Sequence, residues 1–239
     1  YAVELIRHLQ LIDHENEYVV FIKPDVDDSI IKETANFKIV KPAAVFYPIW
    51  EQMALPMAAK KAGCDILHCT SNTAPVFSSV PLVTTLHDII YLENSYSQIM
   101  KGTGTSYQKF GNLYRRMIVP WMIKKCRRII TVSRYEKECI DRFFKIDDDS
   151  RLNMVYNGVG EHFKPVTNDA ELYRIKAKYH LPAQFFFFLG NTDPKKNTKG
   201  TLKAFSDFVK QTGKDYHLVM VDFDLYELEQ LLDEIDDPG

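Results

Sequence analysis

The apolar and polar positions of the chain alternate between the period of a helix and the short runs of a buried strand. Apolar residues in the segment 1–13 recur three and four positions apart, which predicts one face of a helix. Short apolar runs at 17–22 and 37–40 predict strands, and the segment 49–61 again has helical spacing. The chain therefore opens inside a helix and continues with strands and helices in turn.

The same alternation continues through the middle of the chain. Four further apolar runs predict strands at 65–70, 81–88, 127–133 and 152–159. Between the second and third of these, aromatic and aliphatic side chains in 106–125 repeat three and four apart, which predicts a long amphipathic helix. Pro120 lacks a backbone N–H, so we expect this helix to bend there. Another helix is expected over 134–145.

Repeated strand-helix units with nearly continuous apolar strands predict an α/β fold, in which helices cover both faces of a doubly wound parallel sheet. Such a fold normally starts with a strand and a glycine-bearing turn, so we expect part of the sheet edge to be missing. A second strand-helix pattern begins after a linker but contains only two strands. The expected organisation is one domain over 1–164 and a second, incomplete domain over 165–239.

Composition excludes several classes of protein. The 239 residues include 30 basic and 32 acidic side chains, so a net charge of −2 gives no reason to expect nucleic-acid binding. The four cysteines form no Cys-x-x-Cys pair and have no zinc-like histidine spacing, so no metal is expected. Nothing resembles a secretory signal or a transmembrane run, and we expect a cytoplasmic protein.

Ligands of open parallel sheets bind beyond the carboxyl ends of the strands, so polar residues that close an apolar strand are the first candidates. The run 81–88 closes with His87 and Asp88. A structural role is the commoner one for a histidine at such a position, and both roles stay open here. His68 also closes a strand, where a backbone-capping role explains it equally well.

The segment 185–205 predicts a buried strand, a turn and a helix, with Lys195, Lys196 and Lys199 where the helix begins. Cations at a helix N-terminus are unfavourable unless an anion joins them, although a solvated basic turn is an equal alternative. The turn is not a nucleoside-triphosphate P-loop, because Gly200 follows Lys199 instead of Ser or Thr.

The long helix and the residues that follow it are strongly basic. The cations of this stretch are Arg115, Arg116, Lys124, Lys125, Arg127 and Arg128. They predict either a solvated polar face or a peripheral contact with an anionic membrane surface.

Four segments in order resemble the successive signatures of glycosyltransferase family 4. They are "TTLHDIIYLENS", "CRRIITVSRYEKECI", "NMVYNGVGEHFKP" and "FFFFLGNTDPKKNTKGTLKAF". The family consists of retaining nucleotide-sugar enzymes of GT-B architecture. The resemblance therefore implies two Rossmann-like doubly wound parallel-sheet domains facing a cleft, the first binding the acceptor and the second the activated sugar.

The resemblance also implies roles for particular residues. His87 matches the family histidine that faces the transferred sugar, with Asp88 beside it as the second expected catalytic residue. In the donor-binding part of the family pattern, the resemblance implies Gly190, Asn191, Lys195, Lys196 and Asn157. Many relatives have a basic residue where Asn191 stands, and the family's later glutamate pair has no counterpart before Gly239.

The function implied is transfer of a sugar, with retained configuration, from a nucleotide diphosphate sugar to a glycan or lipid-linked acceptor. No cofactor and no metal are expected, and the reaction would serve polysaccharide biosynthesis. Two alternatives remain: a non-catalytic glycosyltransferase-like binding module and a GT-B nucleotide-sugar epimerase. A dehydrogenase is less favoured, because "KGTGTS" lacks the third glycine of a dinucleotide fingerprint.

Overall fold

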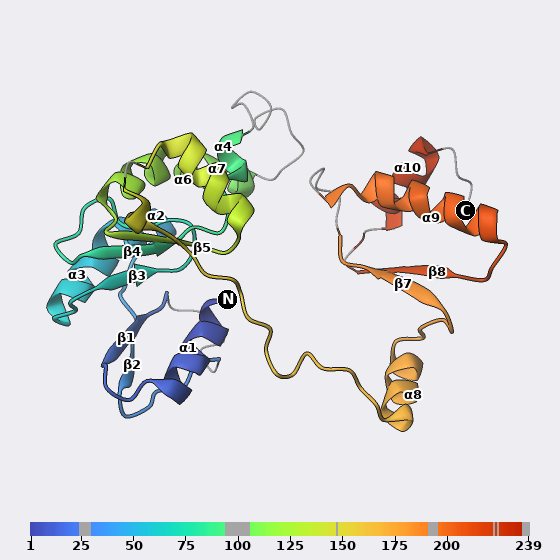
Figure 1. Ribbon diagram of the computed structural model, residues 1–239, viewed down its shortest axis with the longest axis horizontal. Coiled ribbons are helices and arrows are strands. Elements are labelled where there is room, and N and C mark those ends of the chain that lie inside the picture. The colour runs from blue at the N-terminus through green and yellow to red at the C-terminus, as the bar shows by residue number, and fades with distance from the viewer. Residues whose placement is uncertain are drawn as a thin grey trace. The chain divides into compact units, whose positions relative to one another are not determined.

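The structure is a computed structural model that describes residues 1–23, 30–93, 106–146, 148–190, 196–221, 223 and 225–235. The chain divides into two compact units, Tyr1–Gly160 and Glu161–Gly239. Figure 1 shows the elements of each unit, and the two are described separately below.

The first unit contains two parallel sheets. The larger has the strand order β3-β4-β5-β6, formed by Leu67–Cys69, Leu82–Thr85, Arg128–Thr131 and Leu152–Met154. The smaller pairs β1 (Tyr18–Phe21) with β2 (Phe37–Val40). The predicted α/β fold with parallel sheets is thus confirmed. The division into two sheets was not expected.

The helices of this unit follow the predicted order. They are α1 (Ala2–Ile12), α2 (Tyr47–Ile49), α3 (Leu55–Lys61), α4 (Ile90–Glu93), α6 (Ser106–Lys125) and α7 (Arg134–Phe144). The core lies between the larger sheet and α6, where Leu82 and Ile129 of the strands and Val119 and Met122 of the helix are almost completely buried. Burial of this inner stripe explains why α6 forms so long a helix.

Two predicted elements differ in detail from the structure. The strand expected over 152–159 ends at Met154, because after the bond from the Val155 N–H to the Thr131 carbonyl the chain leaves the sheet and becomes exposed. The helix expected over 49–61 contains a π-helical turn, Trp50–Ala54, between α2 and α3. Pro56 has no N–H and its ring would clash with a carbonyl four residues earlier, and a wider turn relieves that clash.

The second unit has one parallel strand pair and three helices in its described part. The strands are β7 (Phe185–Phe188) and β8 (His217–Met220), and the helices are α8 (Asp169–Lys178), α9 (Thr198–Thr212) and α10 (Leu225–Glu234). Phe186 packs against Phe208 and Tyr216, with ring centroids 5.4 and 5.7 Å away. This aromatic cluster joins the strand pair to α9. Leu202 is the one apolar residue among those described in this unit that is buried.

No helix in the described part of the chain is long and apolar enough to span a bilayer.

Candidate active site

His87 is held at the carboxyl end of β4 by two hydrogen bonds. Its backbone N–H donates to Asn72 Oδ1 at 2.6 Å, and its Nε2 lies 2.9 Å from the Thr70 carbonyl oxygen. Because a carbonyl can only accept, this second bond assigns the ring proton to Nε2. Nδ1 is then the nitrogen that a ligand hydroxyl could approach, and the half-exposed position of His87 leaves room for such an approach.

The loop that holds His87 is itself tied to β4. The Asn72 N–H donates to the Thr85 carbonyl at 3.1 Å. Asn72 has a φ of 65°, in the left-handed region that asparagine tolerates better than most residues. The turn around Asn72 therefore presents both acceptors, the Asn72 side chain and the Thr70 carbonyl, to the same histidine.

Two further rings surround this end of β4. The Tyr1 ring meets the His87 ring edge-on with centroids 4.8 Å apart, and its hydroxyl lies 3.4 Å from Thr85 Oγ1. His68 Nε2 lies 2.8 Å from the same Thr85 oxygen. One side of the His68 residue is exposed, but neighbouring atoms desolvate the ring and lower the pKa of His68. His68 thus bonds to the buried Thr85 side chain, whereas a backbone-capping role was an equal expectation from the sequence.

Asp88 lies next to a buried aromatic and cationic pair. Burial raises the pKa of Tyr91, and the negative charge of Asp88 raises it further. The Arg115 guanidinium of α6 lies 5.4 Å from the centre of the Tyr91 ring. Asp88 therefore stands in a mixed electrostatic environment in which α6 contributes the positive charge.

Asn157 lies at the same edge of the larger sheet as His87. It is exposed and follows β6 by three residues, with β5 between β6 and β4. Parallel strands bring their carboxyl ends to one edge, so this placement is consistent with a ligand site there.

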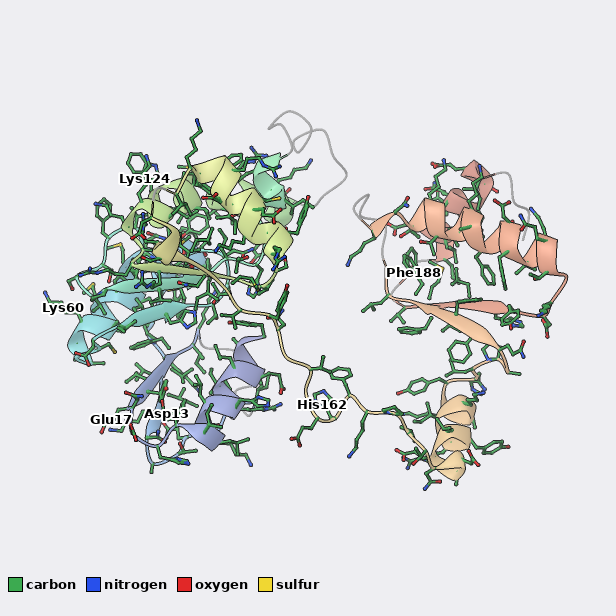
Figure 2. The ribbon with its side chains drawn as sticks, in the orientation of Figure 1. Asp13, Glu17, Lys60, Lys124, His162 and Phe188 are labelled. Atoms are coloured by element: carbon green, nitrogen blue, oxygen red, sulfur yellow. The ribbon has the colours of Figure 1, made fainter. Side chains whose placement is uncertain are left out.

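Gly190 follows β7 at the carboxyl end of that strand. A Cβ added to Gly190 would lie 2.2 Å from the ring of Phe188, so only glycine fits while this ring keeps its place. Figure 2 shows Phe188 beside the end of the strand. Asn191 and Lys195, the next two expected donor-binding residues, lie outside the described residues.

Lys196 is exposed and immediately precedes Asn197, the N-cap residue of α9. Asn197 has a φ of 50° and makes no side-chain capping bond, and the first turn of α9 contains no acidic residue. A Cβ at Gly200 would lie 2.6 Å from the Asn197 side chain, so glycine lets Asn197 pack over this turn. The helix end can therefore accept an anion.

Lys199 has an intramolecular partner. Its Nζ lies 3.1 Å from Glu234 Oε2 of α10, in an ion pair whose two side chains are both exposed. Sequence patterns grouped Lys199 with Lys195 and Lys196, but the folded unit brings an acid 35 positions away to Lys199. Spacing along the chain could not reveal that pair.

The expected site residues thus form two groups. His87, Asp88 and Asn157 belong to the first unit, and Gly190 and Lys196 belong to the second. Sequence analysis missed Thr70 and Asn72, although a Thr-Ser-Asn-Thr run directly after a predicted strand is a signal for a turn that presents polar groups. The contact of Tyr1 with His87 has no signal in the sequence.

Among the described residues, no group of three or more His, Cys, Asp or Glu side chains could hold a metal ion. Burial raises the pKa of the Cys69 thiol and raises that of Cys126 to about 12, so both favour the thiol over the metal-binding thiolate.

Parallel strands with polar side chains at their carboxyl ends define an α/β ligand-binding architecture. Residues 1–162 match the family described as Glycosyltransferase Family 4. Because the match covers more than half of the chain, the protein belongs to glycosyltransferase family 4. This confirms the resemblance found in the sequence.

Two relatives place the chain more closely. It is 22% identical over 196 residues to the O-antigen chain mannosyltransferase RfbU of Salmonella typhimurium (strain LT2), a match covering 81% of this chain and 46% of that protein. A crystal structure of a glycosyltransferase from Rickettsia africae ESF-5 matches with a TM-score of 0.60 and 17% identity. That match covers 98% of this chain and 60% of the other, and shows similarity of fold. The chain therefore spans about half the length of the mannosyltransferase.

Proposed function

We propose that this protein is a retaining glycosyltransferase that moves a sugar from a nucleotide diphosphate sugar to a glycan or lipid-linked acceptor. The observation that carries the proposal is His87, oriented by two hydrogen bonds at the carboxyl end of β4 within the region that matches the family. The related protein is named as an O-antigen chain mannosyltransferase, which makes a mannosyl donor and polysaccharide synthesis the first candidates.

The proposed architecture is GT-B, with two Rossmann-like doubly wound domains meeting near residue 164. In that arrangement His87 comes from the acceptor-side domain and Lys196 from the donor-side domain. Support comes from the parallel sheets of both units and from the family match. The residues that this architecture would use lie at the carboxyl ends of β4 and β7.

In the mechanism we propose, the residues around His87 and those around Lys196 stabilise opposite charges. The transferred sugar acquires oxocarbenium character while negative charge grows on the departing diphosphate. Lys196, Lys195 and the amides that begin α9 stabilise that charge, with Gly190, Asn191 and Asn157 contributing to the donor site. One preorganised donor of this kind typically contributes about 3 kcal/mol to transition-state stabilisation.

On the sugar side, His87 would accept a hydrogen bond from a sugar hydroxyl through Nδ1, since Nε2 is already hydrogen-bonded to the Thr70 carbonyl. This fixes the sugar relative to the leaving group and does not require His87 to change its protonation state. Asp88 stands beside it and would contribute negative charge near the developing cation. This division of roles needs no metal ion.

We also propose that the protein works in the cytoplasm against an anionic membrane surface, through α6. Tyr107, Met117 and Trp121 are 81%, 61% and 61% exposed on this helix, where they follow one another at helical spacing with Phe110. No acidic residue occurs between Glu93 and Glu136. A face with exposed aromatic residues and excess positive charge complements anionic lipid headgroups. Binding to such a membrane surface would bring the protein to a lipid-linked acceptor.

The end of α6 offers a place for such a headgroup. A cavity of about 600 Å³ is lined by Phe77, Ser78, Lys125 and Arg127. Lys124 lies 5.6 Å from the centre of the Trp121 ring. Positive charge and an aromatic ring are therefore adjacent at this end of the helix.

The sugar-transfer proposal is tested with His87→Ala and Lys196→Ala in the intact protein. Each should lower kcat/KM by at least about tenfold, because each removes a group proposed to contact the transition state. His14→Ala and Lys214→Ala serve as controls, since both residues are exposed and precede the amino ends of β1 and β8, away from the carboxyl ends of the strands. Near-normal turnover in both site variants would overturn the assignment.

The donor is identified by thermal shift with guanosine, uridine and adenosine diphosphate sugars, including GDP-mannose. A ligand at about one hundred times its Kd adds roughly 2.7 kcal/mol of stability, which such a panel resolves. A flat panel without turnover would favour the non-catalytic binding module. Conversion of a nucleotide sugar without any acceptor would instead identify an epimerase.

A further inference from the structure

Glu51 is a carboxylate inside the first unit that the proposed reaction does not use. It is 2% exposed and lies in the π-helical turn Trp50–Ala54. Four uncharged groups donate hydrogen bonds to it. Tyr47 and Thr73 donate to Oε1, and Tyr114 and Gln52 donate to Oε2, at 2.6 and 3.0 Å for the latter two.

These bonds tie three distant parts of the chain together. Thr73 belongs to the loop after β3, and Tyr114 belongs to α6. Gln52, the next residue along the helix, donates to the Ala74 carbonyl at 3.2 Å and accepts from the Val76 N–H at 2.9 Å. Three residues of the loop after β3, namely Thr73, Ala74 and Val76, are thus hydrogen-bonded to Glu51 or Gln52.

The fastened loop is the one that holds His87. Thr73 directly follows Asn72, which accepts the His87 backbone N–H, and Thr70 accepts from the ring. The Glu51 carboxylate is therefore connected to the His87 imidazole through the Thr73 hydroxyl and the backbone between Thr70 and Thr73. Removal of an acceptor from a fully hydrogen-bonded buried cluster leaves several donors without partners, so the loop would have to rearrange.

We propose that Glu51 is a positioning residue that, through Thr73, fixes the loop Thr70–Thr73 and so the orientation of the His87 imidazole at the active site. The inference rests on the proposed sugar transfer for its functional meaning. Its structural part, the dependence of His87 on Glu51, holds or fails independently of any activity.

The decisive variants alter the cluster without changing its volume. Glu51→Gln replaces one acceptor oxygen by a donor, and Thr73→Val removes the hydroxyl that links the carboxylate to the loop. Thr73→Ser keeps that hydroxyl and should restore the native behaviour. Tyr114→Phe is the matched control, because it removes one donor to the same carboxylate but from α6 instead of the loop.

The first readout is NMR of the intact protein with labelled histidine. The His87 imidazole signals, assigned by their loss in His87→Gln, should shift or broaden in Thr73→Val and Glu51→Gln and stay near their native positions in Thr73→Ser and Tyr114→Phe. Far-UV circular dichroism checks that each variant is folded. If Glu51→Gln does not fold, the Thr73 pair still decides the question.

The second readout is turnover of the donor sugar found active in the thermal-shift panel. Thr73→Val should lower kcat at least about tenfold and leave the KM for the donor within about twofold, because the proposed diphosphate contacts lie on the other unit. An unchanged His87 signal in Thr73→Val would overturn the inference, and so would a rise in donor KM without loss of kcat. A shifted His87 signal in a protein that transfers no sugar would uphold the positioning and reject the proposed function.

Discussion

Asp13, which directly follows α1, organises the turn into β1 with a single half-buried carboxylate (Figure 2). It accepts from the Tyr18 hydroxyl, from the backbone N–H groups of Glu15 and Asn16 and from the Asn16 side chain. The Tyr18 bond is the largest cause that holds the pKa of Asp13 well below its usual range. The same bond raises the pKa of Tyr18.

These opposite shifts predict a window of pH in which the pair stabilises the first unit. A lowered carboxyl pKa contributes stability above its ordinary value of 3.8, which is lost as the pH falls further. A raised phenol pKa contributes stability below its ordinary value of 10.0, which is lost as the pH rises through the folded value. Tyr18→Phe should therefore slightly lower the urea midpoint at neutral pH.

The measurement compares urea midpoints of the native protein and Tyr18→Phe by tryptophan fluorescence at several pH values. The difference should shrink as the pH is lowered from about 4 to about 2, where the folded Asp13 carboxyl becomes protonated. A difference that is constant over that range would show that the Tyr18 hydroxyl does not act through the Asp13 carboxylate, because Tyr18→Phe keeps the ring that stacks on Phe37.

At the residue scale, the sequence was sufficient to predict candidate site residues that directly follow a strand. It was not sufficient to predict residues whose hydrogen-bond partners are distant in the chain. His87 and Gly190 stand directly after apolar runs, where position along the chain carries the signal. Glu51 stands in an apolar helix pattern, and nothing local indicates whether such a residue faces water or a buried cluster. Its partners Thr73 and Tyr114 lie 22 and 63 positions away.

Among the elements, α6 makes a prediction of its own about membranes. The native protein should sediment with vesicles that contain phosphatidylglycerol, and much less with pure phosphatidylcholine. Lys124→Gln with Lys125→Gln should weaken that binding by roughly thirtyfold, since each cation near an anionic surface contributes about 1 kcal/mol. Lys60→Gln with Lys61→Gln on α3 is the matched control, because these two lysines are also exposed at a helix end.

Fluorescence provides a second test of the same surface. Trp121 is 61% exposed and Trp50 is 8% exposed, so a blue shift on vesicle addition reports Trp121. Equal binding to neutral and anionic vesicles would reject the charge-based explanation. Absence of binding to both would reject α6 as a membrane-facing helix.

Periodicity predicted the order and type of nearly every described element, because α6 and the buried strands carry strong patterns. It could not predict the π-helical turn, since that turn depends on how Glu51 and Pro56 fit the core. Nor could it predict the end of β6 at Met154, because "VYNGV" remains apolar beyond the last residue that pairs with β5. Tertiary pairing, which local propensity does not contain, sets these boundaries.

For the molecule as a whole, the two units differ greatly in their buried cores. The core cluster of the first unit contains buried residues from both layers, whereas Leu202 is the buried apolar residue among those described in the second. Apolar burial is the main source of stability. The second unit should therefore unfold at lower urea than the first.

The positions of the tryptophans make this difference measurable. Trp50 and Trp121 both belong to the first unit, so fluorescence should show one transition at high urea. Circular dichroism, which reports helices of both units, should show an additional transition at lower urea. Superimposable curves would mean that the units unfold together.

At this scale the alternation of strands and helices was sufficient to predict parallel α/β organisation, and the resemblance of the four quoted segments predicted the family. It could not predict that β1 and β2 form a sheet of their own, because strand order is a property of long-range pairing.

The π-helical turn also sets the rotational phase of its helix. Each residue advances an α-helix by about 100°, so in a regular helix Glu51 would share a face with Leu55 and Ala59, but Trp50 would face a different direction. The wider turn realigns the two halves, and all four side chains are buried. Deletion of one residue within this turn would preserve helical content and hydrophobic composition but would rotate one half of the helix toward water. The number of residues in the turn therefore constrains the first unit more tightly than their identity does.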